Sequence, residues 1–156
     1  MDVVFRNFYK KKKVLIIGNT GFKGSWLSIW LKKLGAKVYG LSNDIPTKPS
    51  LFKAALLHNK VKTFYKNIDN LENVISILNI VKPDIIFHLA AQPLVPKSYE
   101  DPINTFKTNS LGFANILEAI RVLNKPTTAV MITSDKVYRN DERKKGYKET
   151  DILHGI

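Results

Sequence analysis

The chain has 156 residues, of which 44% are hydrophobic and 24% charged, and it contains no cysteine. This composition is typical of a globular chain with one core, and it excludes a disulfide framework and thiolate metal sites. No apolar run approaches the roughly 20 residues that span a bilayer, and residues 1–9 lack the long apolar segment of a signal peptide. We therefore expect a cytoplasmic protein with one domain over residues 1–156, no bound metal and no membrane contact.

The formal net charge is +12, from 25 Lys and Arg residues against 13 Asp and Glu residues. The lysines are scattered apart from clusters at residues 10–13 and 139–148, and no basic stripe is interleaved with aromatic residues. We interpret the charge mainly as a solvated surface and do not expect a nucleic-acid partner. Attraction of an anionic nucleotide and nucleic-acid binding stay open as alternatives.

Short apolar runs alternate with helical apolar patterns along the chain. The pattern predicts strands at residues 13–17, 37–41, 61–65, 84–89 and 129–132. It predicts helices at residues 22–34, 51–57, 70–82 and 102–123, a loop at 90–101, and a polar stretch without a regular period at 134–156.

Strands that alternate with helices form a parallel sheet with right-handed crossovers. We therefore expect an α/β fold with a Rossmann-like, doubly wound sheet of strand order 3-2-1-4-5, without a second domain. In such a sheet the ligand lies at the carboxyl ends of the strands, where the order reverses between the first and fourth strands.

Two of the predicted helices carry apolar residues three and four positions apart, which is typical of a helix that packs on a sheet. On the helix at 22–34 the residues expected to be buried are Phe22, Trp26, Leu27, Trp30, Leu31 and Leu34. On the helix at 102–123 they are Phe106, Leu111, Ala114, Leu117 and Ile120. Asp101 followed by Pro102 predicts the start of that second helix.

Three glycines follow the first predicted strand in the spacing Gly18-x-x-Gly21-x-x-Gly24. Gly18 and Gly21 allow the backbone to turn tightly and to come close to a ligand, and Gly24 allows the helix to pack close to its strand. The free N–H groups and the positive dipole at the start of the helix then favour a pyrophosphate. We interpret the turn as a dinucleotide site, with a tight turn that binds no ligand as the alternative.

Three segments together carry a family resemblance: Gly-Asn-Thr-Gly-Phe-Lys-Gly at 18–24, His-Leu-Ala-Ala-Gln-Pro at 88–93 and Ile-Thr-Ser-Asp-Lys-Val-Tyr at 132–138. From residue 12 onward the chain resembles the extended short-chain dehydrogenase/reductase superfamily, and within it the CDP-glucose 4,6-dehydratases. The resemblance implies a lyase that converts CDP-glucose to CDP-4-keto-6-deoxyglucose with NAD as cofactor, for deoxysugars of lipopolysaccharide. The alternatives are an epimerase or reductase of the same superfamily, or a non-catalytic nucleotide-binding remnant.

The resemblance also implies which residues contact NAD. They are Gly18, Thr20, Gly21, Phe22, Lys23, Gly24, Ser42, Asn67, Ile68, Leu89, Ala90, Ala91, Gln92, Asn109 and Thr133. Ser42 stands where the superfamily commonly has an Asp that binds the adenosine ribose, so the residues alone do not separate NAD from NADP. Asn67 stands where an Asp is common beside the adenine, and Phe22 is either a residue of the turn or a core residue.

For catalysis the resemblance points to Ser134, Asp135 and Lys136. Ser134 is expected to hydrogen-bond the 4-hydroxyl of the sugar, Asp135 to protonate the departing 6-hydroxyl, and Lys136 to act as the base at carbon-5. Lys136 stands where many related dehydratases carry a Glu. The alternative for this segment is a capped turn with Lys136 on the surface. His88 is expected to be a core residue with its hydrogen bonds satisfied.

These enzymes oxidise the sugar with a Tyr-x-x-x-Lys pair, and the sequence has that spacing only at Tyr9 and Lys13, before the first strand. The resemblance therefore implies the N-terminal part of an enzyme, without the last strands of the sheet and without the substrate domain. We expect no dehydratase turnover from these 156 residues alone. For the full-length enzyme the resemblance implies a homodimer that pairs through the helix at 102–123 and acts on CDP-glucose or a related nucleotide sugar.

Overall fold

The computed structural model describes residues 4–134 and 136–153. Its centre is a five-stranded sheet with the order β3-β2-β1-β4-β5, in which each neighbouring pair is parallel. The strands are β1 (Lys13–Ile17), β2 (Lys37–Ser42), β3 (Lys62–Tyr65), β4 (Ile85–His88) and β5 (Thr128–Met131). The predicted doubly wound α/β sheet and its strand order are confirmed.

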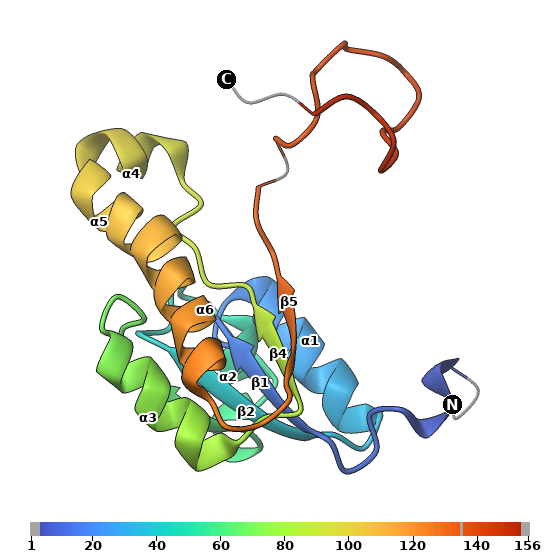
Figure 1. Cartoon of the computed structure of the whole chain (residues 1–156), viewed down its shortest axis with the longest axis vertical. Coiled ribbons are helices and arrows are strands. Elements are labelled where there is room, and N and C mark those ends of the chain that lie inside the picture. The colour runs from blue at the N-terminus through green and yellow to red at the C-terminus, as the bar shows by residue number, and fades with distance from the viewer. Residues whose placement is uncertain (1–3, 135, 154–156) are drawn as a thin grey trace.

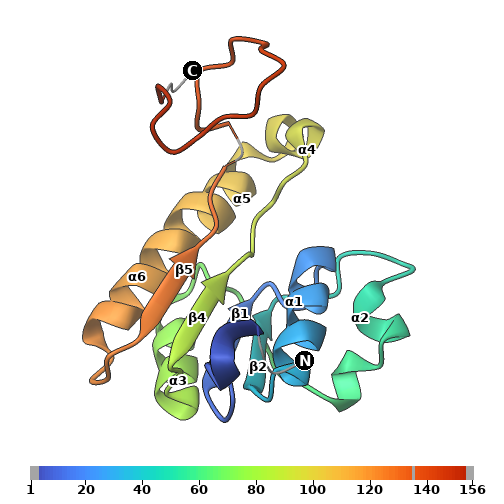
Figure 2. The same ribbon diagram turned by 90° about the vertical axis from the view of Figure 1, so that its right-hand side faces the viewer.

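Helices cover both faces of this sheet, with α3 and α6 on one face and α1 and α2 on the other (Figures 1 and 2). The helices are α1 (Phe22–Lys33), α2 (Leu51–Ala54), α3 (Leu71–Val81), α4 (Val95–Glu100), α5 (Pro102–Phe106) and α6 (Gly112–Val122). Short 3-10 turns, η1 (Val4–Asn7) and η2 (Leu57–Asn59), precede β1 and follow α2. A π-helical turn, η3 (Lys107–Leu111), joins α5 to α6.

Side chains alternate between the two faces of each strand, so the central strand β1 contributes to two cores. The core beneath α1 and α2 contains Val14, Ile16, Leu31, Ala36, Val38, Phe52, Leu57, Val61 and Ile85. The core beneath α3 and α6 contains Leu15, Ile17, Leu41, Ile68, Val74, Ile77, Leu78, Val81, Ile86, Ile116, Ala119 and Leu123. Because both faces of β1 are buried, a ligand can approach this strand only at its end.

Polar side chains cap α2, α3 and α5, and the cap of α5 at Asp101 is the one that the sequence predicts. Ser50, Asn70 and Asp101 each accept the backbone N–H of the residue three positions later, at 3.2, 2.9 and 3.1 Å. Helix α1 begins differently, because Gly21 at its start offers no side-chain cap. The N–H groups of its first turn therefore stay available to a ligand.

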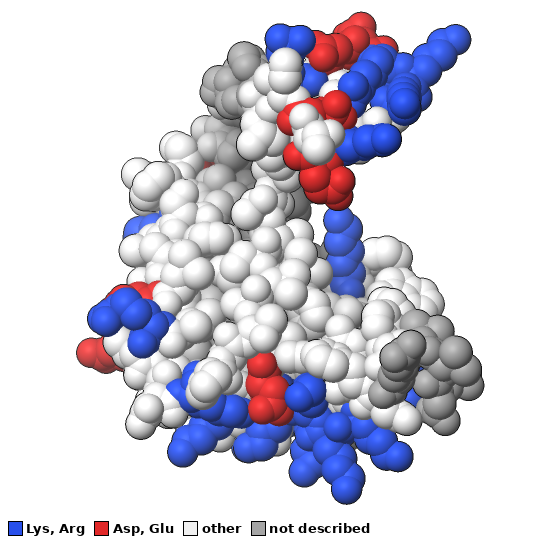
Figure 3. Space-filling view, turned by 45° about the vertical axis from the view of Figure 1, so that its right-hand side comes forward, with Lys and Arg blue, Asp and Glu red and all other residues white. Residues whose placement is uncertain are grey.

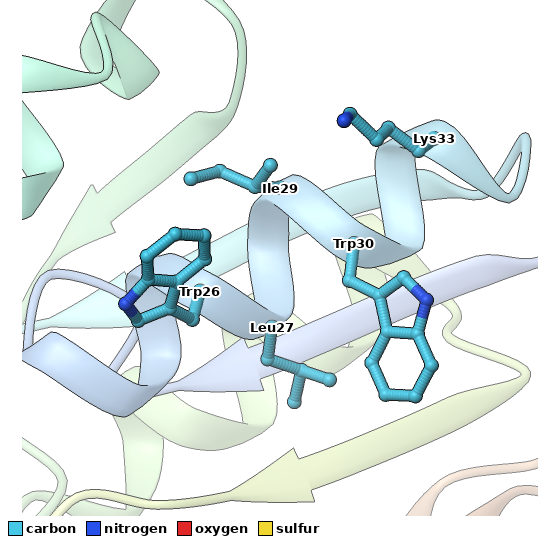
Figure 4. A pocket seen from close by; sticks show the side chains of 5 residues that line it. All are labelled: Trp26, Leu27, Ile29, Trp30 and Lys33. Carbon is cyan, nitrogen blue, oxygen red and sulfur yellow. The ribbon is translucent and has the colours of Figure 1, made fainter.

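Helix α1 buries only part of the face that the sequence predicts: Leu31 is buried as expected, and Leu27 packs partly against the core. Its buried residues are Gly24, Ser25, Ser28 and Leu31, whereas Trp26 and Trp30 are 54% and 51% exposed. The small residues let the helix lie close to the sheet, and the serine hydroxyls donate to carbonyls within the same element and its preceding turn. The large side chains consequently project outward and bound a hollow lined by Trp26, Leu27, Ile29, Trp30 and Lys33 (Figure 4).

The segment from residue 90 to residue 123 also departs from prediction. Residues 95–100 form α4 within the expected loop, and Pro96 lies in its first turn, where proline is well tolerated. The expected helix at 102–123 is present from Pro102 to Val122 as α5, η3 and α6. The π-helical turn η3 shifts its helical phase, and its first half extends beyond the sheet (Figures 1 and 2). The residues buried on α6 are Gly112, Asn115, Ile116 and Ala119, while Phe106, Leu111, Ala114 and Leu117 are exposed.

The chain beyond β5 projects past the carboxyl edge of the sheet (Figure 1). Within it Tyr138 forms an isolated antiparallel bridge with Leu153, and its ring stacks on Tyr147 with centroids 5.2 Å apart. Arg143 lies over the Tyr147 ring at 4.2 Å and pairs with Asp151. In the described part of the chain, no helix combines the length and the apolar character that crossing a bilayer requires.

His88 ends β4 in the interior, with 2% of its surface exposed. Its ring meets Phe113 edge-on at 5.6 Å, and its Nδ1 atom has no hydrogen-bond partner among the described residues. His88 is thus a core residue as expected, but its hydrogen bonds are not fully satisfied. Burial lowers the pKa of His88 from its ordinary value of 6.5 to about 4.

Stability is expected to fall as the pH falls from about 6.5 to about 4, because the unfolded chain binds a proton at His88 before the folded chain does. This difference between the pKa values of the unfolded and folded states corresponds to a loss of about 3 kcal/mol in the free energy of unfolding over that pH range. Urea unfolding of the His88→Phe variant, whose ring cannot be protonated, should show a much weaker pH dependence than the parent chain. His58→Gln, which removes an exposed histidine, should keep the full dependence. An equal pH dependence of the free energy of unfolding in the parent and in His88→Phe would contradict the lowered pKa of His88.

Candidate functional site

Two loops meet at the carboxyl ends of the central strands. The N–H of Gly18, which follows β1, donates to the carbonyl of Leu41 in β2 at 2.7 Å. The N–H of Leu89, which follows β4, donates to the carbonyl of Ile17 in β1 at 2.8 Å. The strand order reverses between β1 and β4, so these loops border the crevice where ligands of such sheets bind.

The three glycines of the turn are required for different reasons. Gly18 has φ of +90°, and a Cβ atom there would lie 2.8 Å from the backbone nitrogen of Ala90 in the loop after β4. A Cβ atom on Gly24 would lie 2.1 Å from the carbonyl oxygen of Gly18. A Cβ atom on Gly21 would meet only that same oxygen, at 3.4 Å. Gly18 and Gly24 therefore allow the close backbone contacts of the turn, whereas the absence of a side chain at Gly21 leaves space for a ligand above the turn.

The first turn of α1 is electrostatically suited to an anion. It contains no acidic residue, and its free N–H groups carry the positive end of the helix dipole. Phe22 and Lys23 lie on its exposed side, and Phe22 is 72% exposed. The interpretation of Phe22 as a core residue is therefore wrong, and its contact with NAD stays a prediction.

A buried polar network lies directly behind the turn. Asn19 is fully buried, and its Nδ2 donates to Thr63 Oγ1 in β3 at 2.8 Å. Its Oδ1 accepts from Ser42 Oγ at 3.0 Å, and Ser42 Oγ accepts from the Thr20 N–H at 3.4 Å. The Thr20 hydroxyl donates to the carbonyl of Asp44 at 2.6 Å. The hydroxyls of Ser42 and Thr20 thus face the interior, and the network ties the turn to the ends of β2 and β3.

Sequence reasoning missed Asn19 and Thr63 as members of this site. A signal was present, because Gly40 lies inside β2 and a glycine within a strand often marks a close approach. A Cβ atom on Gly40 would lie 2.2 Å from the Asn19 side chain. Gly40 therefore makes room for the amide.

The loop after β4 is held by the helix that follows it. Asn109 Oδ1 accepts the N–H of Gln92 at 2.8 Å, and Asn109 Nδ2 donates to the carbonyl of Gln92 at 3.0 Å. Gln92 also donates through Nε2 to Thr105 Oγ1 at 3.1 Å. Asn109 lies in the π-helical turn η3, a type of distortion that is frequent at functional sites. Leu89, Ala90, Ala91 and Gln92 are thereby fixed beside the glycine turn.

On the other side of the turn, residues 67 and 68 follow β3. Ile68 is 8% exposed and packs in the core, and its carbonyl accepts Asn115 Nδ2 at 2.9 Å. A Cβ atom on Gly112 would lie 2.6 Å from the Ile68 side chain, so α6 packs closely at this point. Asn67 is exposed at the surface, where its side chain remains available.

The predicted catalytic segment leaves the sheet from the end of β5. The N–H of Ile132 donates to the carbonyl of His88 at 3.0 Å, so the segment begins beside the loop at 89–92. Thr133 and Ser134 are exposed, and Ser134 Oγ accepts the N–H of Lys136 at 2.9 Å. This bond does not decide between the catalytic roles and the capped turn, and the roles of Ser134 and Lys136 stay predictions. Asp135 lies outside the described residues.

Basic side chains gather at two ends of the molecule, on the segment beyond β5 and at the end opposite the crevice (Figure 3). The second group lies where the first strands begin. Lys13, Lys37 and Lys62 are the first residues of β1, β2 and β3. Lys125 donates to Asp84 at 2.7 Å, and this bond, together with the N–H of Lys13, holds the pKa of Asp84 below its usual value. The basic group therefore lies apart from the glycine turn, and we do not include it in the site.

Comparison with known proteins defines the family. Residues 15–155 match the family model of GDP-mannose 4,6 dehydratase, and the chain belongs to this family. It is 42% identical over 153 residues to CDP-glucose 4,6-dehydratase from Salmonella typhimurium, an alignment that covers 98% of this chain and 43% of the relative. It is 32% identical over 142 residues to a GDP-mannose 4,6-dehydratase from Vibrio cholerae, covering 82% of this chain and 37% of that protein.

Solved structures agree with the fold. The UDP-glucose 4-epimerase of Thermus thermophilus in complex with NAD superposes with a TM-score of 0.77 at 28% identity, covering 91% of this chain and 44% of that chain. The epimerase of Thermotoga maritima with UDP-glucose gives a TM-score of 0.77 at 26% identity, covering 92% and 45%. The chain thus spans less than half the length of the proteins that it matches.

The variants Gly24→Ala and Gly21→Ala should differ in stability, because Gly24 is closely packed against the turn whereas Gly21 has space around it. Gly24→Ala places a methyl group against a backbone carbonyl and is expected to cost more than about 3 kcal/mol or to prevent folding. Gly21→Ala meets ordinary contact distances and should cost no more than about 1 kcal/mol. Chemical denaturation measures both values. Similar costs for the two variants would contradict the close packing of α1 on the turn.

Proposed function

We propose that this chain is the NAD-binding part of a nucleotide-sugar 4,6-dehydratase that acts on CDP-glucose. The observation that carries the proposal is the contact of the glycine turn with the loop at 89–92, at the point where the strand order reverses. Family membership and 42% identity to the Salmonella typhimurium CDP-glucose 4,6-dehydratase support the substrate class.

The residues of the crevice fit a dinucleotide. The pyrophosphate would bind to the N–H groups at the start of α1, where Gly21 leaves space. The adenosine would lie toward the ends of β2 and β3, near Asn67. The nicotinamide ribose would lie over Ala90 and Ala91, small residues of a loop that Asn109 holds in place.

The reaction removes water from the sugar, and the residues that follow β5 would move its protons. NAD, when bound, supplies a reversible hydride acceptor, so that the hydride from carbon-4 returns at carbon-6. Ser134 would hydrogen-bond the 4-hydroxyl. Lys136 would take the proton from carbon-5 and return a proton there when the hydride reaches carbon-6, and Asp135 would give a proton to the 6-hydroxyl as it leaves as water. The proton of the 4-hydroxyl would pass to the tyrosine of the Tyr-x-x-x-Lys pair that the resemblance implies for the full-length enzyme.

We further propose that the whole protein works as a cytoplasmic homodimer in the synthesis of deoxysugars for lipopolysaccharide. The pairing surface would be the exposed side of α5 and α6. Ile103, Phe106 and Leu117 are 67%, 68% and 46% exposed there, and apolar side chains that are exposed together commonly mark an interface.

Calorimetric titration with NAD tests cofactor binding by this chain. The parent chain should bind NAD, and Gly21→Ala should weaken binding at least about tenfold while it remains folded, because its methyl group occupies the pyrophosphate space. Trp26→Ala, on the outer side of α1, is the matched control and should bind as the parent does. Absence of heat at millimolar NAD, or equal binding by Gly21→Ala, would contradict the proposal.

A chimera tests the catalytic roles. In it, residues 1–156 replace the matched part of the Salmonella typhimurium relative, and formation of the 4-keto product from CDP-glucose is measured. Lys136→Met should lower kcat by about 100-fold or more, as expected for loss of a general base. Lys145→Met, an exposed lysine of the same segment, should keep full activity.

Two results would count against these roles. A chimera that folds and binds NAD but forms no product would contradict the dehydratase assignment. A Lys136→Met chimera as active as its parent would show that Lys136 belongs only to the capped turn.

A further inference from the structure

Both tryptophans of the chain, Trp26 and Trp30, lie on the outer side of α1. They are 54% and 51% exposed, and together with Leu27, Ile29 and Lys33 they line a hollow on that side of the helix (Figure 4). Single exposed apolar residues are ordinary, whereas apolar side chains that are exposed side by side mark an interaction surface. The outer side of α1 is therefore a candidate for such a surface.

A second segment extends this apolar surface. The ring of Phe5 meets the ring of Trp30 edge-on, with centroids 5.7 Å apart, and Tyr9 connects Phe5 to Phe8 at 5.4 and 5.1 Å. Phe5 and Phe8 are 43% and 55% exposed. We call Phe5, Phe8, Trp26 and Trp30 the aromatic surface. Two segments that are separate in the sequence thus form one apolar surface in the fold.

Lysines from both segments lie beside the aromatic surface. Lys33 lines the hollow on α1, and the Nζ atom of Lys12 lies 5.2 Å from the centroid of the Phe8 ring. Lys10 packs at the end of α1, where a Cβ atom on Gly35 would lie 3.5 Å from the Cγ atom of that lysine. The ammonium groups are carried on flexible stems, so they can reach a common anionic partner.

The part of the sequence that forms this surface contains no acidic residue. Residues 3–43 include eight Lys residues and one Arg residue, but no Asp or Glu. The sequence shows no basic stripe interleaved with aromatic residues, yet the fold brings basic and aromatic side chains together. The surface is therefore cationic and apolar at the same time.

These two properties define the partner. Duplex nucleic acid would pair with the lysines but would offer the exposed rings no apolar phase. A bilayer with anionic headgroups offers both, because tryptophan rings are enriched at the membrane–water interface and lysines are attracted to an anionic leaflet. A bilayer is also broad enough to meet the rings and the lysines of both segments at once. The observations therefore favour a lipid surface.

We propose that the aromatic surface and its lysines bind the chain to the surface of an anionic membrane, with the rings at the level of the headgroups. A protein that lies on a bilayer needs no spanning helix. The proposal thus departs from the expectation of no membrane contact, which rested on the absence of an apolar run of spanning length. It does not rest on the proposed dinucleotide site, because Trp30 and Lys33 lie in the second half of α1, away from the glycine turn.

Vesicles of phosphatidylcholine with about one-third phosphatidylglycerol test the proposal, and vesicles of phosphatidylcholine alone are the reference. Both tryptophans belong to the aromatic surface, so the fluorescence of the 156-residue chain should shift to shorter wavelength when the anionic vesicles are added. Cosedimentation should give binding to the anionic vesicles that is at least about tenfold tighter than binding to the reference and that weakens as salt screens the charges.

One double variant tests the rings. Trp26→Ser combined with Trp30→Ser should weaken cosedimentation with the anionic vesicles at least about tenfold, because two apolar side chains no longer enter the interface. Tyr99→Ser removes an exposed ring on α4 and should bind as the parent does. Urea unfolding checks that each variant is folded.

A second double variant tests the charges. Lys10→Gln combined with Lys33→Gln should weaken binding about tenfold to thirtyfold, since each lysine near an anionic leaflet contributes about fivefold. Lys144→Gln combined with Lys145→Gln is the matched control, because it removes the same net charge from exposed residues beyond β5. This control should change binding less than about threefold. Equal losses in the two double variants would overturn the proposal, since only the net charge of the chain would then matter.

Other outcomes would also overturn the proposal. One is equal binding to both kinds of vesicle, or binding without a fluorescence shift. Another is a dimer in sedimentation that Trp26→Ser with Trp30→Ser dissociates, which would assign the surface to a second copy of the chain. Tighter binding to duplex DNA than to the anionic vesicles would assign it to nucleic acid. Loss of vesicle binding in the chimera would show that the rest of the enzyme covers the surface. None of these results bears on NAD binding, which is measured without vesicles.

Discussion

The close contact between Gly24 and the carbonyl of Gly18 is the constraint on which the rest of the structure depends. Any side chain at residue 24 would overlap that carbonyl, because even a Cβ atom would lie 2.1 Å from it. The contact brings the start of α1 directly over the end of β1. A second close contact, between Gly18 and Ala90, joins the same turn to the loop after β4. Two glycines thus bring together the two halves of the crevice.

The arrangement of α1 follows from this contact. A helix that lies so close to its strand can bury only small residues there, and Gly24, Ser25 and Ser28 are the ones that it buries. The indole rings of Trp26 and Trp30 are left outside (Figure 4). The same closeness leaves a narrow space behind the turn, which Asn19 fills with hydrogen bonds to Thr63 and Ser42.

The sheet could be predicted from the sequence because its central strands β1 and β4 are short apolar runs and the strands alternate with helical patterns. The glycine turn could be predicted because three glycines at this spacing, between a strand and a helix, are typical of a dinucleotide site. The cap at Asp101 could also be predicted, because a side chain that accepts a nearby N–H acts locally.

The buried faces of the helices could not be predicted in the same way. Apolar spacing on α1 indicated Trp26 and Trp30 as core residues, but the close contact at Gly24 decided the orientation of the helix. The buried residues predicted for the helix at 102–123 were mostly wrong, because η3 is a π-helical turn that shifts the helical phase. No local sequence pattern indicates such a turn. Asn19 and its partner Thr63 lie 44 positions apart, and only the sheet topology brings them together.

The central claim is that a dinucleotide binds where the glycine turn meets the loop after β4, and two-dimensional amide NMR during a titration with NAD tests it directly. We predict that the largest shift changes fall on the amides of Gly18, Gly21, Ala90 and Gln92, with little change at Trp26 and Trp30. Shift changes confined to the outer face of α1 or to the lysine-rich end of the sheet would contradict the claim.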